Sequence, residues 1–187
     1  PVGADVKATS KVTFTFTLGE WHHGQAINEA DILHAIAEVF RLVTPGTDIY
    51  DPVAASPTRT IFVNNFKGIK FLSEDVAEVY IDYWHLDDSY IAWYANVWPE
   101  GPWELCALAN KVVSEKKTAW SVDMADEWGV DMLDGTKGTS IPILADALET
   151  LAAENHIPPE LDGIVTESEA AARWGALQDW YSETGHF

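Results

Sequence analysis

The sequence predicts an α+β fold, in which a small mixed or antiparallel sheet packs against several helices. Three observations lead to this prediction. Residues 11–18 alternate between apolar and polar side chains, which is typical of a half-buried strand. Several later segments repeat apolar residues at the spacing of an amphipathic helix. Strands and helices are mixed early in the chain and helices alone follow, over 187 residues that suit one domain.

The strands are expected to form a sheet with one buried face. The first strand directs its apolar side chains to the same side: Val12, Phe14, Phe16 and Leu18. Residues 61–72 are expected to hold one or two short strands, and residues 76–85 alternate again. The turn-forming segment 73–75 joins these two regions into a hairpin, whose second strand we expect at the centre of the sheet. Prolines and small residues predict a loop over 46–60, and residues 1–10 are expected to be extended.

Capping signals predict where the helices of the first half begin. Asn28 and Asp31 have the spacing of a capping box, and the helix that they open is expected to end at Pro45-Gly46. Asp87 or Asp88 is expected to cap a short helix over 89–98. The prolines that follow end that helix, and a further helix is expected over 103–115.

Three helical segments are expected in the second half. Residues 124–128 suit one helical turn within a region that has no clear pattern. Ser140 is expected to cap the next helix. Thr166 and Glu169 form a second capping box, and the helix that they open is expected to end at Gly185.

The charge balance restricts the classes of partner. The chain has 11 Lys and Arg against 30 Asp and Glu, a formal net charge of -19. A field this negative repels phosphate groups, so we expect no nucleic-acid partner, and anionic membrane surfaces are disfavoured. Neutral or cationic partners remain. Net negative charge also opposes self-association, so we expect a monomer.

Residues that could catalyse a reaction or bind a metal show no recognisable pattern. Cys106 is the only cysteine and lies in an apolar, helix-like segment, so we expect a buried and unreactive thiol. The six histidines lack the spacing of zinc ligands. Acidic pairs such as Asp87 and Asp88 are expected by chance in a chain with so many carboxylates. We therefore predict no catalytic residue, no metal and no cofactor.

Aromatic residues are abundant: nine Trp, six Tyr and seven Phe. Such a surplus suits either a large core or a surface that holds organic ligands. The candidate ligand-binding residues are Trp93, Tyr94, Trp98 and Trp103, with packing in the core as the alternative.

One motif carries a resemblance to a known family. A strand leads into Trp21-His22-His23-Gly24, and the helix that follows begins with Ala30-Asp31. This run resembles the extracellular solute-binding proteins of family 5, the peptide- and nickel-type receptors of ABC importers. The corresponding sequence motif of that family is close to Trp-His-Asp-Gly followed by Thr-Ala-x-Asp. Trp21, His22, Gly24, Ala30 and Asp31 match the family motif with approximately its spacing, whereas His23 replaces its usual Asp. We interpret these residues as structural: Gly24 permits a tight turn, and Asp31 can accept from helix N–H groups.

The resemblance implies a domain organisation. Residues 1–187 would form one α+β subdomain of a two-lobed, type II binding protein, and the chain would be a fragment of a longer one. Residues 11–113 form the strand, helix and hairpin part that resembles the family. Residues 118–187 form a helical part that we interpret as a possible insertion.

The resemblance also implies a function without catalysis. The protein would bind peptides or similar small solutes by lobe closure and deliver them to a membrane permease of an ABC importer. It would be extracellular, periplasmic or at the cell surface, anchored through parts absent from this chain. The alternatives are a cell-surface structural or protein-interaction module that has lost transport, and a hydrolase that uses an acidic pair.

Overall fold

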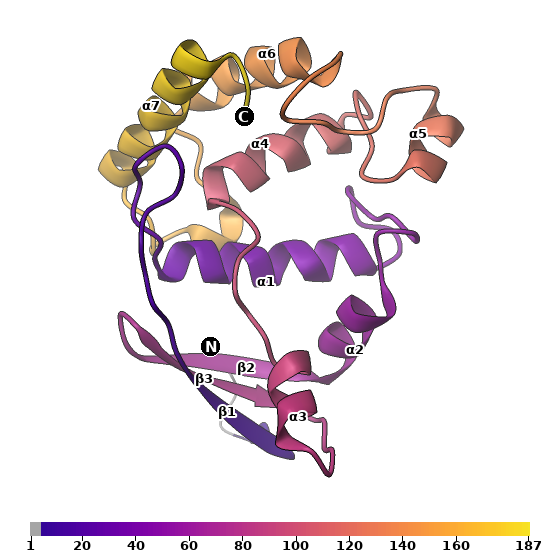
Figure 1. Ribbon diagram of the computed structural model, residues 1–187, viewed down its shortest axis with the longest axis vertical. Helices are drawn as coiled ribbons and strands as arrows, with labels where there is room; N and C mark the ends of the chain where they lie inside the picture. The colour runs from indigo at the N-terminus through magenta and orange to yellow at the C-terminus, as the bar shows by residue number, and fades with distance from the viewer. Residues whose placement is uncertain (1–4) are drawn as a thin grey trace.

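The computed structural model describes residues 5–187 and has the α+β fold that the sequence predicts. Residues 1–4 of the expected extended segment lie outside the described residues. Three layers are stacked in Figure 1: the sheet, then helix α1, then the helices α4, α6 and α7. The strands are β1 (Ser10–Thr15), β2 (Phe66–Ser73) and β3 (Val76–Ile81). The helices are α1 (Glu29–Val43), α2 (Pro57–Asn65), α3 (Asp88–Tyr94), α4 (Trp103–Ser114), α5 (Val122–Trp128), α6 (Ser140–Ala153), the short 3-10 helix η1 (Pro159–Leu161) and α7 (Glu167–Thr184).

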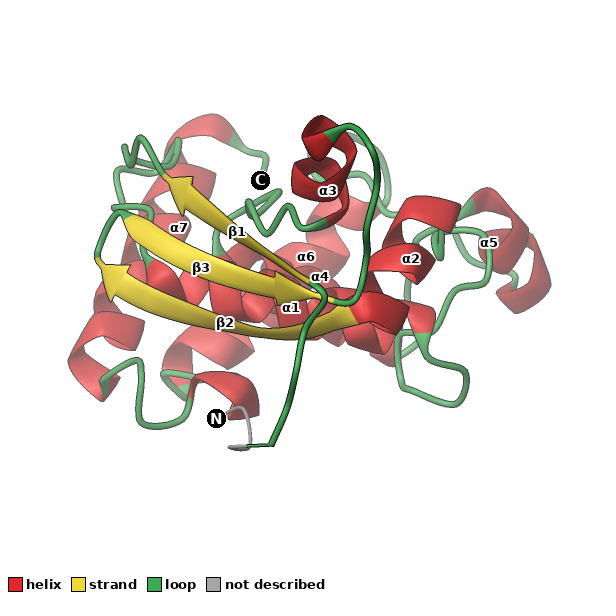
Figure 2. Cartoon of the chain, turned by 90° about the horizontal axis from the view of Figure 1, so that it is seen from below, coloured by secondary structure: helices red, strands yellow, loops and turns green. Residues whose placement is uncertain are grey.

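The sheet is antiparallel, with the strand order β1-β3-β2. The predicted hairpin is therefore confirmed, and its second strand, β3, is central. Ala77, Val79 and Ile81 of β3 are fully buried and face α1, as their alternation predicts. Figure 2 views the sheet from its other face, which no helix of the described residues covers.

Helix α1 lies between two hydrophobic cores and contributes to both. Its capping box is confirmed: the Asn28 side chain accepts from the Ala30 N–H at 3.0 Å, and Asp31 Oδ2 accepts from the Asn28 N–H at 3.0 Å. Ile32 packs into the core between α1 and the sheet, whereas Ala30 packs into the core formed by the helices. One amphipathic helix thus joins the sheet layer to the helical layer.

The helical core is built around two buried tryptophans. Trp103 at the start of α4 and Trp174 in α7 meet edge to face, with ring centroids 5.7 Å apart. Leu144 and Leu148 of α6 and Leu177 of α7 complete the centre of this core. The capping box of α7 is confirmed, and Gly185 ends the helix in the left-handed conformation.

Some element boundaries differ from the prediction. Residues 57–65 form helix α2, where the sequence predicts first a loop and then a strand, because Ser56 caps the helix and Pro57 starts its first turn. Ser140 is the first residue of α6 rather than its cap, and its hydroxyl accepts from the Asp134 N–H instead. The strand expected over 76–85 ends at Ile81. None of the helices between residues 5 and 187 combines the length and apolar character that a membrane crossing needs.

Candidate functional site

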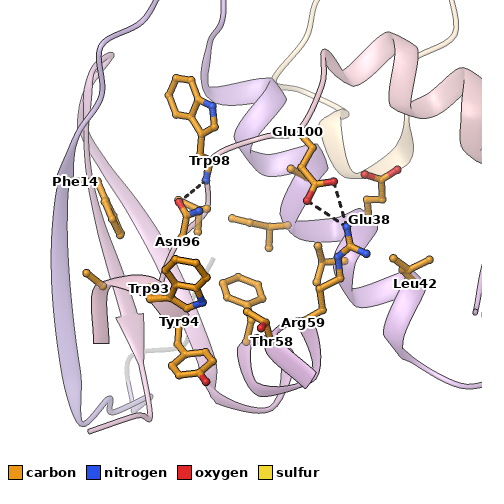
Figure 3. Close-up of a pocket in the computed structure, with 16 residues that line it drawn as sticks. Phe14, Glu38, Leu42, Thr58, Arg59, Trp93, Tyr94, Asn96, Trp98 and Glu100 are labelled. Atoms are coloured by element: carbon orange, nitrogen blue, oxygen red, sulfur yellow. Dashed lines mark hydrogen bonds and ion pairs between the residues drawn. The ribbon is translucent and has the colours of Figure 1, made fainter. Parts of the chain in front are cut away.

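An open pocket lies between helices α1, α2 and α3 at one end of the sheet (Figure 3). Its volume of about 360 Å³ lies within the usual range for sites that hold small organic molecules. We call it the aromatic pocket. Its lining residues come from β1, α1, α2, α3 and the segment after α3: Phe14, Ala35, Ile36, Glu38, Val39, Leu42, Thr58, Arg59, Phe62, Ala92, Trp93, Tyr94, Asn96, Val97, Trp98 and Glu100.

Aromatic rings form one side of this pocket. Trp93 and Trp98 are 68% and 39% exposed, so both rings offer surface to a ligand. The Trp98 ring lies 5.7 Å from the Phe16 ring, between centroids, and the backbone N–H of Trp98 donates to Asn96 Oδ1 at 3.1 Å. The Tyr94 ring is tilted by 57° against the Tyr83 ring, with centroids 4.7 Å apart. These contacts position the Trp98 and Tyr94 rings.

Charged residues form the opposite side (Figure 3). The Arg59 guanidinium donates to both carboxylate oxygens of Glu100 at 3.2 Å and to the Ala54 carbonyl at 3.0 Å. Glu38 lies on α1 beside this pair. Burial raises the pKa of Glu38, and the nearby His34 and Asn110 partly oppose this rise.

A second pocket of about 400 Å³ adjoins the first on its charged side. Glu38, Leu42, Arg59 and Glu100 line both pockets. Cys106 also lines the second pocket, where burial raises the pKa of its thiol well above the usual value. The thiol is therefore held in its unreactive protonated form.

The lining of the aromatic pocket suits binding by packing and hydrogen bonding. Thr58 and Asn96 supply hydroxyl and amide groups among mainly apolar neighbours. None of the described residues that line it is a histidine or a cysteine. Across residues 5–187, no three His, Cys, Asp or Glu side chains gather in a way that could hold a metal ion.

The structure brings together three of the four candidate aromatic residues. Trp93, Tyr94 and Trp98 all line the aromatic pocket. Trp103 does not, since it is fully buried in the helical core against Trp174. Its position in that core suits packing rather than contact with a ligand.

The residues of the family motif surround the start of α1, away from the aromatic pocket. Gly24 has a φ of +80°, and its N–H donates to the Trp21 carbonyl at 2.9 Å in a tight turn. Trp21 Nε1 donates to Asp31 Oδ2 at 3.1 Å. Ala30 is buried in the helical core, and the His22 ring lies 4.8 Å from the ring of Trp180.

Asp31 belongs to a buried charged network that the sequence analysis missed. Arg173 of α7 donates to Asp31 Oδ1 at 2.7 Å and to Glu104 Oε2 of α4 at 2.7 Å. His23 Nε2 lies 2.5 Å from Glu104 Oε1. Burial alone would raise the pKa of Glu104, but His23 and Arg173 outweigh it and hold the pKa below its usual value. The available signal was Arg173 itself, an arginine on the apolar face of a helix between Ala170 and Leu177.

Comparisons with known proteins add no relative. A scan against protein-family models finds no match to the chain, and a search of curated proteins finds none either.

Proposed function

We propose that this chain is part of an extracellular or periplasmic solute-binding protein of family 5, which serves an ABC importer of peptides or similar small solutes. The motif around Trp21, Gly24 and Asp31 supports the family, and the turn and capping contacts of these residues suit the structural role proposed for them. The chain binds its solute as a monomer without changing it chemically. A second lobe closes over the solute, and the receptor passes it to the membrane permease.

The observation that carries a binding role is the aromatic pocket. The Trp98 and Tyr94 rings contact neighbouring aromatic side chains, the Trp93 and Trp98 rings remain partly exposed, and polar groups are few among the mainly apolar lining residues. Such a lining accepts side chains of different shapes, because apolar contacts are not directional. This tolerance suits a receptor for peptides.

The experiment that tests binding is calorimetric titration of the chain with a panel of short peptides. Trp98→Ala removes a pocket ring and should weaken binding by about tenfold or more, as loss of a buried aromatic contact does. Trp84→Ala is the control, because Trp84 is also an exposed tryptophan, 68% against 39% for Trp98, and does not line the pocket. Equal effects of the two substitutions, or no binding of any peptide, would contradict the proposal.

The mass and the cellular location of the native polypeptide in its source cells test the importer role. An antibody raised against this chain should detect a surface-associated protein several times heavier than 20.7 kDa. A native protein near 20.7 kDa would exclude the two-lobed receptor.

A protein-interaction module is the second candidate function. Exposed apolar side chains gather on and before α3, including Trp84, Leu86, Tyr90 and Trp93, and Leu86 is 86% exposed. Exposed apolar patches of this kind mark protein contacts in other proteins. A native protein near 20.7 kDa would favour this function over transport.

A further inference from the structure

We propose that the solute group bound in the aromatic pocket is an organic cation, with its ammonium or guanidinium at Glu38 and its apolar body against the rings. This inference rests on the proposed binding function and names the chemistry of that same pocket. It is carried by the charges on one side of the pocket and the rings on the other (Figure 3).

The charges at the pocket leave one carboxylate uncompensated. The Arg59 guanidinium is already satisfied by the two oxygens of Glu100 and by the Ala54 carbonyl. Glu38 has no ion-pair partner within 4.0 Å among residues 5–187. The three charged side chains together carry a net negative charge, and the position that lacks a counter-charge is that of Glu38.

Partial burial makes Glu38 receptive to a cation. A carboxylate withdrawn from water has lost part of its hydration, which is why burial raises its pKa. An arriving ammonium restores a favourable partner through a charge-assisted hydrogen bond. A neutral ligand of the same shape cannot form this charge-assisted hydrogen bond. A carboxylate ligand would be repelled by the like charges of Glu38 and Glu100.

The rings and the overall field favour the same ligand class. The faces of Trp93, Trp98 and Tyr94 attract cations as well as apolar groups. The net charge of -19 draws cations towards the molecule and repels anions. A pocket of about 360 Å³ has room for one ring with a short aminoalkyl chain.

The test compares three probes of nearly the same size by calorimetric titration at neutral pH and fixed salt. They are 2-phenylethylamine, which is a cation, 2-phenylethanol, which is neutral, and 3-phenylpropionate, which is an anion. We expect the amine to bind about tenfold more tightly than the alcohol, and the anion to bind most weakly. Equal affinities, preference for the anion, or no binding of the amine would overturn the inference.

Two substitutions separate the local carboxylate from the overall field. Glu38→Gln should abolish the preference for the amine, so that the amine and the alcohol bind with similar affinities. Glu149→Gln is the matched control, since it removes the same charge from an exposed position on α6, outside the pocket lining. If both variants lose the preference equally, the field alone produces it and Glu38 is not the cation site.

The outcomes distinguish this inference from the proposed function. Peptides whose binding depends on Trp98, together with probes that bind equally, would retain the solute-binding function and remove the cation preference. A clear amine preference that depends on Glu38, in a native protein near 20.7 kDa, would retain the pocket chemistry and remove the importer.

Discussion

At the scale of single residues, Arg173 connects segments of the chain that lie far apart in the sequence. Its guanidinium is buried and pairs with Asp31 on α1 and Glu104 on α4, and it also donates to the Ala26 carbonyl at 3.1 Å. Replacing it with Met should lower the free energy of unfolding by about 3–5 kcal/mol, because two buried carboxylates lose their counter-charge. Urea denaturation followed by circular dichroism measures this loss.

Arg41→Met is the control for the Arg173 prediction. Arg41 pairs with Asp48 at 2.7 Å on the surface, where water screens the interaction. We expect a cost of at most about 1 kcal/mol. Similar losses for the two variants would show that the buried network contributes no more than a surface ion pair.

At the scale of elements, substitution by alanine should have opposite effects on stability at two glycines, one inside α7 and one at its C-terminal cap. Gly175 lies inside the helix, and an added Cβ there meets no atom within 4 Å. Gly175→Ala should therefore raise the free energy of unfolding by about 0.5–1 kcal/mol, through the higher helix propensity of alanine. Gly185 ends the helix with a φ of +74°. Gly185→Ala should lower the free energy of unfolding by about 1 kcal/mol, because a Cβ is strained in that conformation.

Thermal unfolding of the two glycine variants measures the gain in stability at Gly175 and the loss at Gly185 under the same conditions. The Gly185 site is also open around its Cβ, so steric contact does not complicate the comparison. Destabilisation by Gly175→Ala would mean that this region of α7 needs the glycine for packing, which the open space around it argues against.

At the scale of the whole molecule, stability should depend strongly on salt. Thirty acidic residues against 11 basic ones repel one another across the folded surface. Salt shortens the Debye length from about 30 Å at 0.01 M to about 10 Å at 0.1 M, which screens this repulsion. The melting temperature should rise over this range of potassium chloride, as differential scanning calorimetry can measure.

The opposite salt response would identify a different balance of charges. Surface ion pairs such as Lys11 with Glu78, at 2.5 Å, weaken when salt is added. A melting temperature that falls with salt would mean that such pairs outweigh the general repulsion. Sucrose at matched water activity is the control, since it stabilises folded proteins without screening charge.

The sequence by itself determined the elements whose causes are local. The capping boxes at Asn28 and Thr166 depend on residues three positions apart, and both helices begin where these signals predict. The alternation in β3 predicted which of its side chains are buried. Helix α2 was not predicted from the sequence, because β-branched residues such as Ile61 and Val63 suit a strand as well as a helix.

Only the tertiary structure decided which of these residues meet. Trp98 and Trp103 look alike in the sequence, yet one lines a pocket and the other fills a core, because each position depends on what packs against it. No pattern in the sequence around Glu38 or Arg59 indicates that these two residues line the same pocket. Arg173 reaches Asp31 across 142 positions of the chain. Local hydrogen bonds and periodicity specify elements, whereas burial and charge pairing depend on distances that exist only after those elements have packed.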